Sequence, residues 1–407
     1  MESKKICVIQ SPLDTFSGYG ARSRDFIKSL ISLKKDEWDI SLISTPWGKT
    51  SLGFLNPNKK DEKDMLDRII STLPKEIDVF IQITIPNEFT PKGKTNIGVT
   101  AGIETTACAA SWLEGCNRMS HIIVPSKHAK DVFTNTEYSI TDKNTQTTSI
   151  LKLTKPVFVL FEGVDVSVYK KSSLFSNIEL NKKLSSIEEE FAYLFVGHWL
   201  PGEFGEDRKN VSYTIKAFLE TFKDNLNAPA LILKTQHSTA SILDRDVILQ
   251  RIDNIIKTVR YNKSIPNIYL INGDLEDYEI NELYNHPKVK CMISFTKGEG
   301  FGRPLLEFAA VGKPIICSGW SGHIDFLDPN FSLLVSGTLE KVHPSTANEM
   351  ILAEAKWLKV NDEQVGRSLV HMFTNYKHWK KQAEIYSKTI HHEFSLNKMT
   401  QKLKHLI

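Results

Sequence analysis

Residues 294–316 read SFTKGEGFGRPLLEFAAVGKPII, and they predict a glycine-rich turn between a strand and a helix. An apolar run ends where this stretch begins, and glycines then alternate with other residues over 298–302. Residues 303–311 have a helical pattern, in which Pro304 stands so early that its missing N–H costs nothing. Gly312 suits the left-handed residue that follows a helix. Such a turn presents free N–H groups and the positive end of a helix dipole, which favour an anion, typically a phosphate.

Two carboxylates flank this turn, Glu299 within it and Glu307 one turn into the helix. A carboxylate repels a phosphate unless it has another target, and hydroxyl groups give it strong charge-assisted hydrogen bonds. A ligand with phosphate in the middle and sugar hydroxyls on both sides satisfies this arrangement. The stretch therefore predicts a nucleotide-sugar site. The alternative is an ordinary loop between strand and helix with two solvated glutamates.

The two glutamates have seven residues between them, and the segment GEGFGRPLLEFAA resembles the donor-site motif of retaining GT-B glycosyltransferases, especially glycosyltransferase family 4. The resemblance implies an α/β protein with the GT-B fold, two facing Rossmann-like domains built on parallel sheets. It also implies a hexosyl- or pentosyltransferase that moves a sugar from a nucleotide-diphosphate sugar to an acceptor hydroxyl with retention. In that family arrangement Glu299 holds the sugar, Glu307 holds the ribose, and the N–H groups of Gly300, Phe301 and Gly302 face the diphosphate.

A second candidate anion-binding feature is a pair of cations at the start of another predicted helix. Arg208 and Lys209 stand there, after a strand and a polar loop. Two cations at a helix N-terminus oppose the helix dipole unless an anion lies between them. Relatives in the family place an Arg and a Lys here against the donor diphosphate. The resemblance therefore implies that Arg208 and Lys209 contact the diphosphate. It also implies a contact between the turn at Leu275 and the nucleobase. His198 departs from the family pattern, because relatives often carry an Arg directly after the strand.

The first half of the chain opens with a strand, a turn that carries Gly18, Tyr19 and Gly20, and a helix, which is typical of a Rossmann-like domain. The resemblance implies that this turn lies near the donor phosphates and the acceptor. The alternative is that the two glycines only permit the turn. Glu104 follows the predicted strand 95–100, where the resemblance implies an acid near the sugar or the acceptor. Here the alternative is an acid that the dipole of a nearby helix favours.

The 407 residues suit two domains of roughly 200 residues each. We predict an acceptor-side domain over 1–172, a polar linker over 173–190, and a nucleotide-sugar-binding domain over 191–393. The resemblance implies that the last helix, 394–407, packs back on the first domain. Its apolar and basic residues also fit a peripheral contact with an anionic membrane.

Composition narrows the remaining possibilities. A net charge of +3 does not by itself indicate a nucleic-acid-binding protein. The five cysteines are odd in number and lack CxxC spacing, which predicts buried free thiols in a reducing compartment. We see no secretory apolar segment and no membrane span, so a cytoplasmic protein is expected. No DxD stands at a strand end and no histidine cluster has ligand spacing, so we expect a metal-independent enzyme without a cofactor.

Two other functions stay open at this stage. One is a module that binds a nucleotide sugar without turnover, and the other is a different GT-B enzyme, such as a phosphorylase or an epimerase. For a transferase, the acceptor could be a glycan, a lipid-linked glycan, a protein or modified DNA. The sequence specifies neither the base nor the sugar of the donor.

Overall fold

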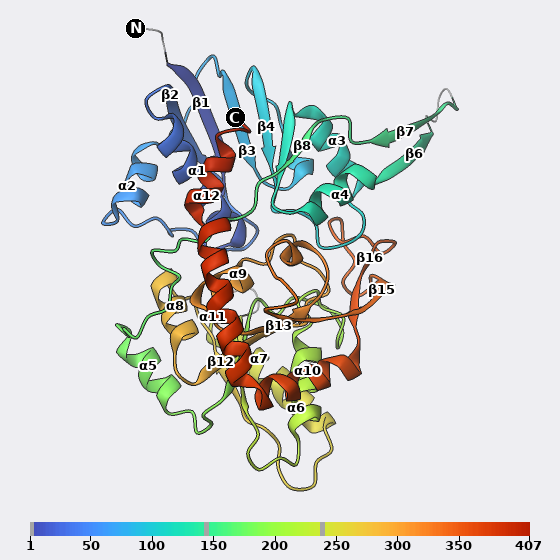
Figure 1. The fold of residues 1–407 in the computed structure, drawn as a ribbon. Helices are drawn as coiled ribbons and strands as arrows, with labels where there is room; N and C mark the ends of the chain where they lie inside the picture. Colours follow the sequence, from blue (N-terminus) through green and yellow to red (C-terminus); the bar gives the residue numbers. More distant parts are fainter. Residues whose placement is uncertain (1–3, 142–145, 237–240) are drawn as a thin grey trace. The chain divides into compact units, whose positions relative to one another are not determined.

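The computed structural model describes residues 4–141, 146–236 and 241–407, and the chain divides into two compact units (Figure 1). Unit 1 comprises Met1–Gly163, Glu349–Ala355 and Leu396–Ile407, and unit 2 comprises Val164–Asn348 and Lys356–Ser395. Each unit holds a six-stranded sheet in which every neighbouring pair of strands is parallel. The predicted α/β class with two parallel sheets is therefore confirmed.

The sheet of unit 1 has the order β2-β1-β3-β4-β5-β8. Its strands are β1 (Lys5–Ser11), β2 (Trp38–Ser44), β3 (Val79–Ile83), β4 (Thr95–Val99), β5 (His121–Val124) and β8 (Val157–Val159). The chain runs from β1 to β2 on one side and then returns to β3 on the other side of β1. Its direction along the sheet therefore reverses between β1 and β3, which is where open α/β sheets bind ligands.

Five helices and a hairpin surround this sheet. The helices are α1 (Gly18–Lys34), α2 (Lys60–Asp67), α3 (Ala110–Arg118), α4 (Lys127–Asn135) and α12 (Leu396–Leu403), with a short 3-10 turn, η1 (Pro86–Glu88). The antiparallel hairpin of β6 (Glu137–Thr141) and β7 (Thr148–Lys152) projects from the body of the unit (Figure 1).

The last helix, α12, lies along α1 within unit 1 (Figure 1). Met399 and Leu403 are fully buried there, and Thr400 donates a hydrogen bond to Ser29 (Oγ1–Oγ distance 2.8 Å). The buried Arg22 of α1 also reaches the sulfur of Met399, at 3.4 Å. This packing buries apolar residues of α12, the same residues that suggested the alternative of a membrane contact. Among the described residues, no helix combines the length and the apolar character needed to cross a membrane.

The sheet of unit 2 has the order β11-β10-β9-β12-β13-β14. Its strands are β9 (Ala192–Val196), β10 (Ala230–Lys234), β11 (Ile268–Ile271), β12 (Val289–Ser294), β13 (Ile315–Ser318) and β14 (Leu333–Val335). Here the chain direction reverses between β9 and β12. A separate antiparallel pair joins β15 (Gly337–Lys341) to β16 (Lys356–Val360).

Two groups of helices pack in unit 2. One group is α6 (Val211–Phe222), α7 (Ile242–Thr258) and α10 (Asp362–Thr374), and the other is α8 (Asp277–Asn285), α9 (Arg303–Val311) and α11 (Tyr376–Glu393). Members of a group contact one another, as expected when right-handed crossovers place α6 and α9 on opposite faces of the sheet. A cluster of buried aromatic and aliphatic residues beneath α6 and α10 forms the core of this unit.

The segment expected as a linker, 173–190, contains a helix and lies within unit 2. Helix α5 (Ile178–Ser185) buries Leu180 and Leu184. The carboxylate of Glu282 on α8 accepts hydrogen bonds from the N–H groups of Ser176 (2.7 Å) and Asn177 (3.0 Å). The polar composition of the segment therefore reflects the exposed side of a docked helix.

Close packing of α3 on η1 generates a stability prediction. A Cβ atom at Gly115 would lie 1.8 Å from the carbonyl oxygen of Pro86, so Gly115→Ala must separate the two elements and should cost about 1–3 kcal/mol. The matched control is Gly366→Ala in α10, where the nearest atom, Thr221 Oγ1, is 3.6 Å away. This control should stabilise by about 0.5–1 kcal/mol, because alanine favours a helix over glycine. Urea unfolding measures both changes, and a stabilisation by Gly115→Ala would contradict the close approach.

Candidate functional site

The candidate site lies where the chain direction reverses in the sheet of unit 2. The loop after β9, residues 197–210, and the turn after β12, residues 295–302, leave neighbouring strands toward different helices. The two segments are bonded to each other. The N–H of Lys297 donates to the carbonyl oxygen of Arg208 (2.8 Å), and the side chain of Asn210 donates to the carbonyl oxygen of Phe295 (3.1 Å). Residues far apart in the sequence therefore meet at the carboxyl edge of this sheet.

The turn and the helix after it have the predicted geometry. Helix α9 covers Arg303–Val311, as the sequence predicted, and both glycines that bound it are left-handed, Gly302 with a φ of 96° and Gly312 with a φ of 79°. The N–H groups of Phe301 and Gly302 donate to no acceptor within residues 4–141, 146–236 and 241–407. Phe301 is only 3% exposed. Two donors at a helix N-terminus are thus available to an anion.

The loop after β13 is hydrogen-bonded to the glycine-rich turn. Ser321 accepts a hydrogen bond from the N–H of Glu299 (2.9 Å), and the N–H of Gly322 donates to the carbonyl oxygen of Glu299 (2.9 Å). Ser321 has a φ of 79°, which is strained for a residue with a side chain, and a Cβ at Gly322 would lie 2.1 Å from the Gly300 carbonyl oxygen. Sequence reasoning missed Ser321; the repeated Ser-Gly of SGWSG was the available signal.

Arg208, Lys209 and Glu299 form one buried ionic cluster. Lys209 Nζ lies 2.5 Å from Glu299 Oε1, and Arg208 donates to Glu299 Oε2 (3.2 Å) and to the carbonyl oxygen of Gly298 (3.1 Å). Burial by itself raises the pKa of Glu299, but the charges of Lys209 and Arg208 outweigh it and hold that pKa at about 2. The cluster therefore contains two cations and one carboxylate, with a net positive charge that suits an anion.

Glu307 is also buried, at 6% exposure, so neither glutamate of the motif is solvated. Its Oε1 accepts from Arg303 (2.8 Å), one helical turn earlier, and its Oε2 lies 3.4 Å from the hydroxyl of Tyr284. Burial, and then the charge of Glu307, raise the pKa of Tyr284. The alternative of two solvated loop glutamates is therefore wrong.

Leu275 follows β11, the outermost strand of the sheet. It therefore lies at the same edge as the glycine-rich turn but three strands away from it. It is half-buried, in a turn where Gly273 has a φ of 116°. The ammonium of Lys234, at the end of β10, donates to the Gly273 carbonyl oxygen (2.6 Å), and burial lowers the pKa of this lysine. Lys234 therefore anchors this turn.

Asp207 is a site residue that sequence reasoning missed. It is 1% exposed, its Oδ2 accepts from the N–H of Val211 at the start of α6 (3.3 Å), and its Oδ1 has no partner in the described part of the chain. Burial raises its pKa to about 6. Asn210, between them, has a left-handed φ of 57°, so Asp207 takes over part of the capping that Asn210 does not provide. Arg208 and Lys209 thus follow directly after a buried, protonatable carboxyl group.

The predicted residues of unit 1 gather around Tyr19. Its hydroxyl lies 2.9 Å from Thr100 Oγ1 at the end of β4, and its ring stacks on Trp47 with centroids 4.0 Å apart. Burial raises the pKa of Tyr19, and the charge of Glu104 raises it further.

The glycines of the same turn differ from each other. A Cβ at Gly20 would lie 2.3 Å from the Thr15 carbonyl oxygen, whereas nothing lies near Gly18. A side chain at position 20 would therefore clash with the backbone, so glycine is required there, whereas position 18 has space for a side chain. The predicted residues therefore form two groups, one in each unit.

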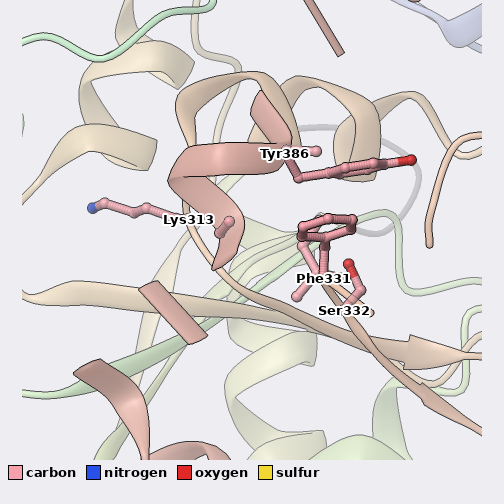
Figure 2. A pocket seen from close by; sticks show the side chains of 7 residues that line it. Lys313, Phe331, Ser332 and Tyr386 are labelled. Atoms are coloured by element: carbon pink, nitrogen blue, oxygen red, sulfur yellow. The ribbon is translucent and has the colours of Figure 1, made fainter. Parts of the chain in front are cut away.

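Two further features bear on ligands. Within the described residues no three His, Cys, Asp or Glu side chains are grouped as metal ligands would be. A small pocket in unit 2 lies beside Phe331 and Tyr386, whose rings stack with centroids 4.7 Å apart, while Lys313 extends away from them (Figure 2). Its volume of about 10 Å³ holds at most one water, so it is a packing gap.

The titration of Asp207 generates a pH prediction. Because its pKa is raised from 3.8 to about 6, the folded chain holds a proton there that the unfolded chain has lost. The free energy of unfolding therefore falls as the pH rises through this window, by up to about 3 kcal/mol. Asp207→Asn removes this titration, so its stability relative to the wild type should rise between about pH 4 and pH 7. Urea unfolding of the wild type, this variant and the exposed control Asp253→Asn measures it; a pH-independent difference for Asp207→Asn would contradict the burial.

Comparison of the sequence with protein-family models gives no match, and comparison with curated proteins gives none. The structure is nevertheless similar to solved structures along nearly the whole chain. A glycosyltransferase from Rickettsia africae ESF-5 is 14% identical with a TM-score of 0.63, covering 99% of this chain and 98% of that one. Sucrose-phosphate synthase from Thermosynechococcus elongatus is 9% identical with a TM-score of 0.61, covering 99% and 98%.

A third similar structure is Anabaena HepE in complex with UDP-glucose, which is 12% identical with a TM-score of 0.59 and is covered over 98% of both chains. At these identities the likeness concerns the fold. The chain therefore has the GT-B fold, with a Rossmann-like parallel sheet in each of its two units.

Proposed function

We propose that this protein is a glycosyltransferase that moves a sugar from a nucleotide-diphosphate sugar to an acceptor hydroxyl. The observation that carries the proposal is the buried cluster of Arg208, Lys209 and Glu299 beside the unpaired N–H groups of Phe301 and Gly302. Two cations, two amide donors and a helix N-terminus converge on one edge of the sheet. This is the donor set that a diphosphate requires.

The ionic cluster also gives each residue a role in binding the donor. When the diphosphate binds, its charge replaces that of Glu299 as the partner of Lys209 and Arg208. The carboxylate of Glu299 is then released to accept hydrogen bonds from the sugar hydroxyls. Glu307, held by Arg303, accepts from the ribose hydroxyls, and Leu275 lies at the base.

In the proposed reaction the bond between the anomeric carbon and the phosphate oxygen breaks, and a bond to the acceptor oxygen forms. The acceptor proton passes to the leaving phosphate oxygen. Arg208, Lys209 and the amides stabilise the negative charge that develops on the diphosphate, in a site where little water weakens them. We propose that these groups replace a metal ion in this role, and that the sugar is transferred with retention.

The comparisons support a nucleotide sugar as donor, because HepE was crystallised with UDP and with UDP-glucose. Glu104 and the turn with Gly18, Tyr19 and Gly20 are proposed to serve the acceptor, since they lie at the carboxyl edge of the other sheet. The acceptor could be a glycan, a lipid-linked glycan, a protein or modified DNA. A cytoplasmic location belongs to the proposal, because all five cysteines are free and buried.

A ligand panel tests this function directly. We expect one of UDP, GDP or ADP, and its sugar derivative, to raise the melting temperature in the presence of EDTA, since ligand at 100 times its dissociation constant adds about 2.7 kcal/mol. Release of nucleoside diphosphate from that donor should accelerate when simple glycosides are added. Binding without release would indicate a module without turnover, and no binding by any nucleotide would contradict the proposal. Activity lost in EDTA and restored by magnesium would contradict metal independence.

The opposite charges of Lys209 and Glu299 predict opposite effects on binding. Lys209→Ala should weaken nucleoside diphosphate by about 1.5–3 kcal/mol, because a charge-assisted hydrogen bond to phosphate is lost. Glu299→Gln removes the carboxylate that competes with the diphosphate, so affinity should stay equal or rise while kcat with the intact donor falls.

Lys216→Ala, in helix α6 just after the loop that carries Lys209, is the matched control and should change neither quantity. Calorimetry with the nucleoside diphosphate and kinetics with the donor measure these effects. A loss of diphosphate affinity in Glu299→Gln as large as in Lys209→Ala would overturn these roles.

A further inference from the structure

Unit 1 has a pocket of its own, at the point where its chain direction reverses between β1 and β3. The volume is about 190 Å³, and the lining comes from the carboxyl ends of three neighbouring strands. Gln10 of β1 and Gln82 of β3 stand side by side in the register of the sheet, and Thr45 follows β2 directly. Thr84 and Glu88 complete the wall after β3. The volume corresponds to about six waters, which is the space of a single sugar ring rather than of a lipid chain or an oligosaccharide.

The polar groups that line the pocket beside Gln10, on and after β3, are bonded to one another. The amide nitrogen of Gln82 donates to the Glu88 carbonyl oxygen (3.0 Å), and its amide oxygen accepts from the N–H of Thr90 (2.8 Å). The hydroxyl of Thr84 donates to Oε2 of Glu88. Gln82 is 4% exposed whereas Glu88 is exposed, so this network forms without a ligand and joins a buried carboxamide to a carboxylate at the surface.

The lining of the pocket offers both donor and acceptor atoms. Gln10 Oε1 accepts from Lys92 Nζ (2.9 Å), so the amide nitrogen is the group of Gln10 that remains to donate to a ligand. Glu88 uses Oε2 for Thr84, and its Oε1 has no donor in the described ranges. Thr45 adds a hydroxyl that donates and accepts. A ligand whose own groups both donate and accept matches this set, and sugar hydroxyls are such groups.

The charges of the pocket select against an anion. Glu88 contributes a carboxylate to the lining, whereas Lys92, which donates to Gln10 Oε1, is not among the described residues that line the pocket. A phosphate or carboxylate on the ligand would therefore meet a like charge. This contrasts with unit 2, where a cationic cluster lies at the corresponding edge.

We propose that this pocket binds one neutral sugar ring, which makes the acceptor a glycan whose bound unit carries no phosphate or carboxylate. The identification of that ring as part of the acceptor rests on the proposed function. The pocket itself is defined by unit 1 alone. Pro46 leads from the pocket to Trp47, whose ring stacks on Tyr19, so the pocket adjoins the predicted acceptor-side residues.

The test uses saturation-transfer NMR on the full chain with methyl glycosides of glucose, galactose, mannose, xylose and N-acetylglucosamine. Glucose 6-phosphate and glucuronic acid are the charged counterparts. We expect at least one neutral glycoside to bind the wild type, and neither charged sugar to do so. Gln10→Ala and Glu88→Ala should each weaken that binding about tenfold or more, because each removes a direct hydrogen bond. The control Glu76→Ala, an exposed acid ahead of the amino end of β3, should bind as the wild type does.

The proposal is wrong if no neutral glycoside binds, or if a charged sugar binds as well as a neutral one. It is also wrong if Gln10→Ala and Glu88→Ala both melt at the wild-type temperature and both still bind the glycoside as the wild type does. Binding of nucleoside diphosphate is measured in the same samples. If the nucleotide fails to bind while a glycoside binds at the pocket, the proposed function fails and the sugar pocket stands. If the nucleotide binds and no glycoside does, the pocket assignment fails alone.

Discussion

The buried ion pair between Glu299 and the cations Lys209 and Arg208 is the interaction on which the candidate site depends. It ties the loop after β9 to the turn after β12, and the bonds from Lys297 and Thr296 to the Arg208 carbonyl oxygen reinforce it. Burying three charges costs free energy, and hydrophobic residues of similar volume often stabilise a protein as well as a buried ion pair does. Retaining this cluster makes physical sense if a ligand anion exchanges with the carboxylate. The cluster then keeps the cations oriented and partly neutralised until the ligand arrives.

Both units place their polar groups at the same topological position but equip it differently. The reversal between β9 and β12 carries cations and free amides, whereas the reversal between β1 and β3 carries carboxamides, hydroxyls and a carboxylate. A parallel sheet leaves its strand ends free at this point, because the helices on either side diverge. The side chains therefore give the two edges different charges, with two cations and one carboxylate in unit 2 and a carboxylate in the pocket lining of unit 1.

Local patterns in the sequence were enough to predict the elements around the site. The bounds of α9, the left-handed Gly312 and the strand before the turn follow from apolar periodicity, an early proline and a terminal glycine, all of which act over a few residues. The two parallel sheets were instead implied by the resemblance of GEGFGRPLLEFAA to the donor-site motif of GT-B glycosyltransferases. The segment 173–190 shows the limit of such patterns, because its helix is stabilised by Leu180 and Leu184 docking rather than by local propensity.

The sequence by itself indicated the α/β fold class and the glycine-rich turn before a helix, and it singled out Arg208, Lys209, Glu299 and Glu307 as candidate site residues. Only the tertiary structure decided which of these groups are partners, because Lys209 and Glu299 are 90 residues apart and meet through sheet order. It also decided that Asp207 is buried with an unpaired oxygen, and that Gln10 and Gln82 line one pocket. The burial of a side chain and its choice of partner depend on how far apart the elements lie in space. The periodicity of a single segment carries no information about that distance.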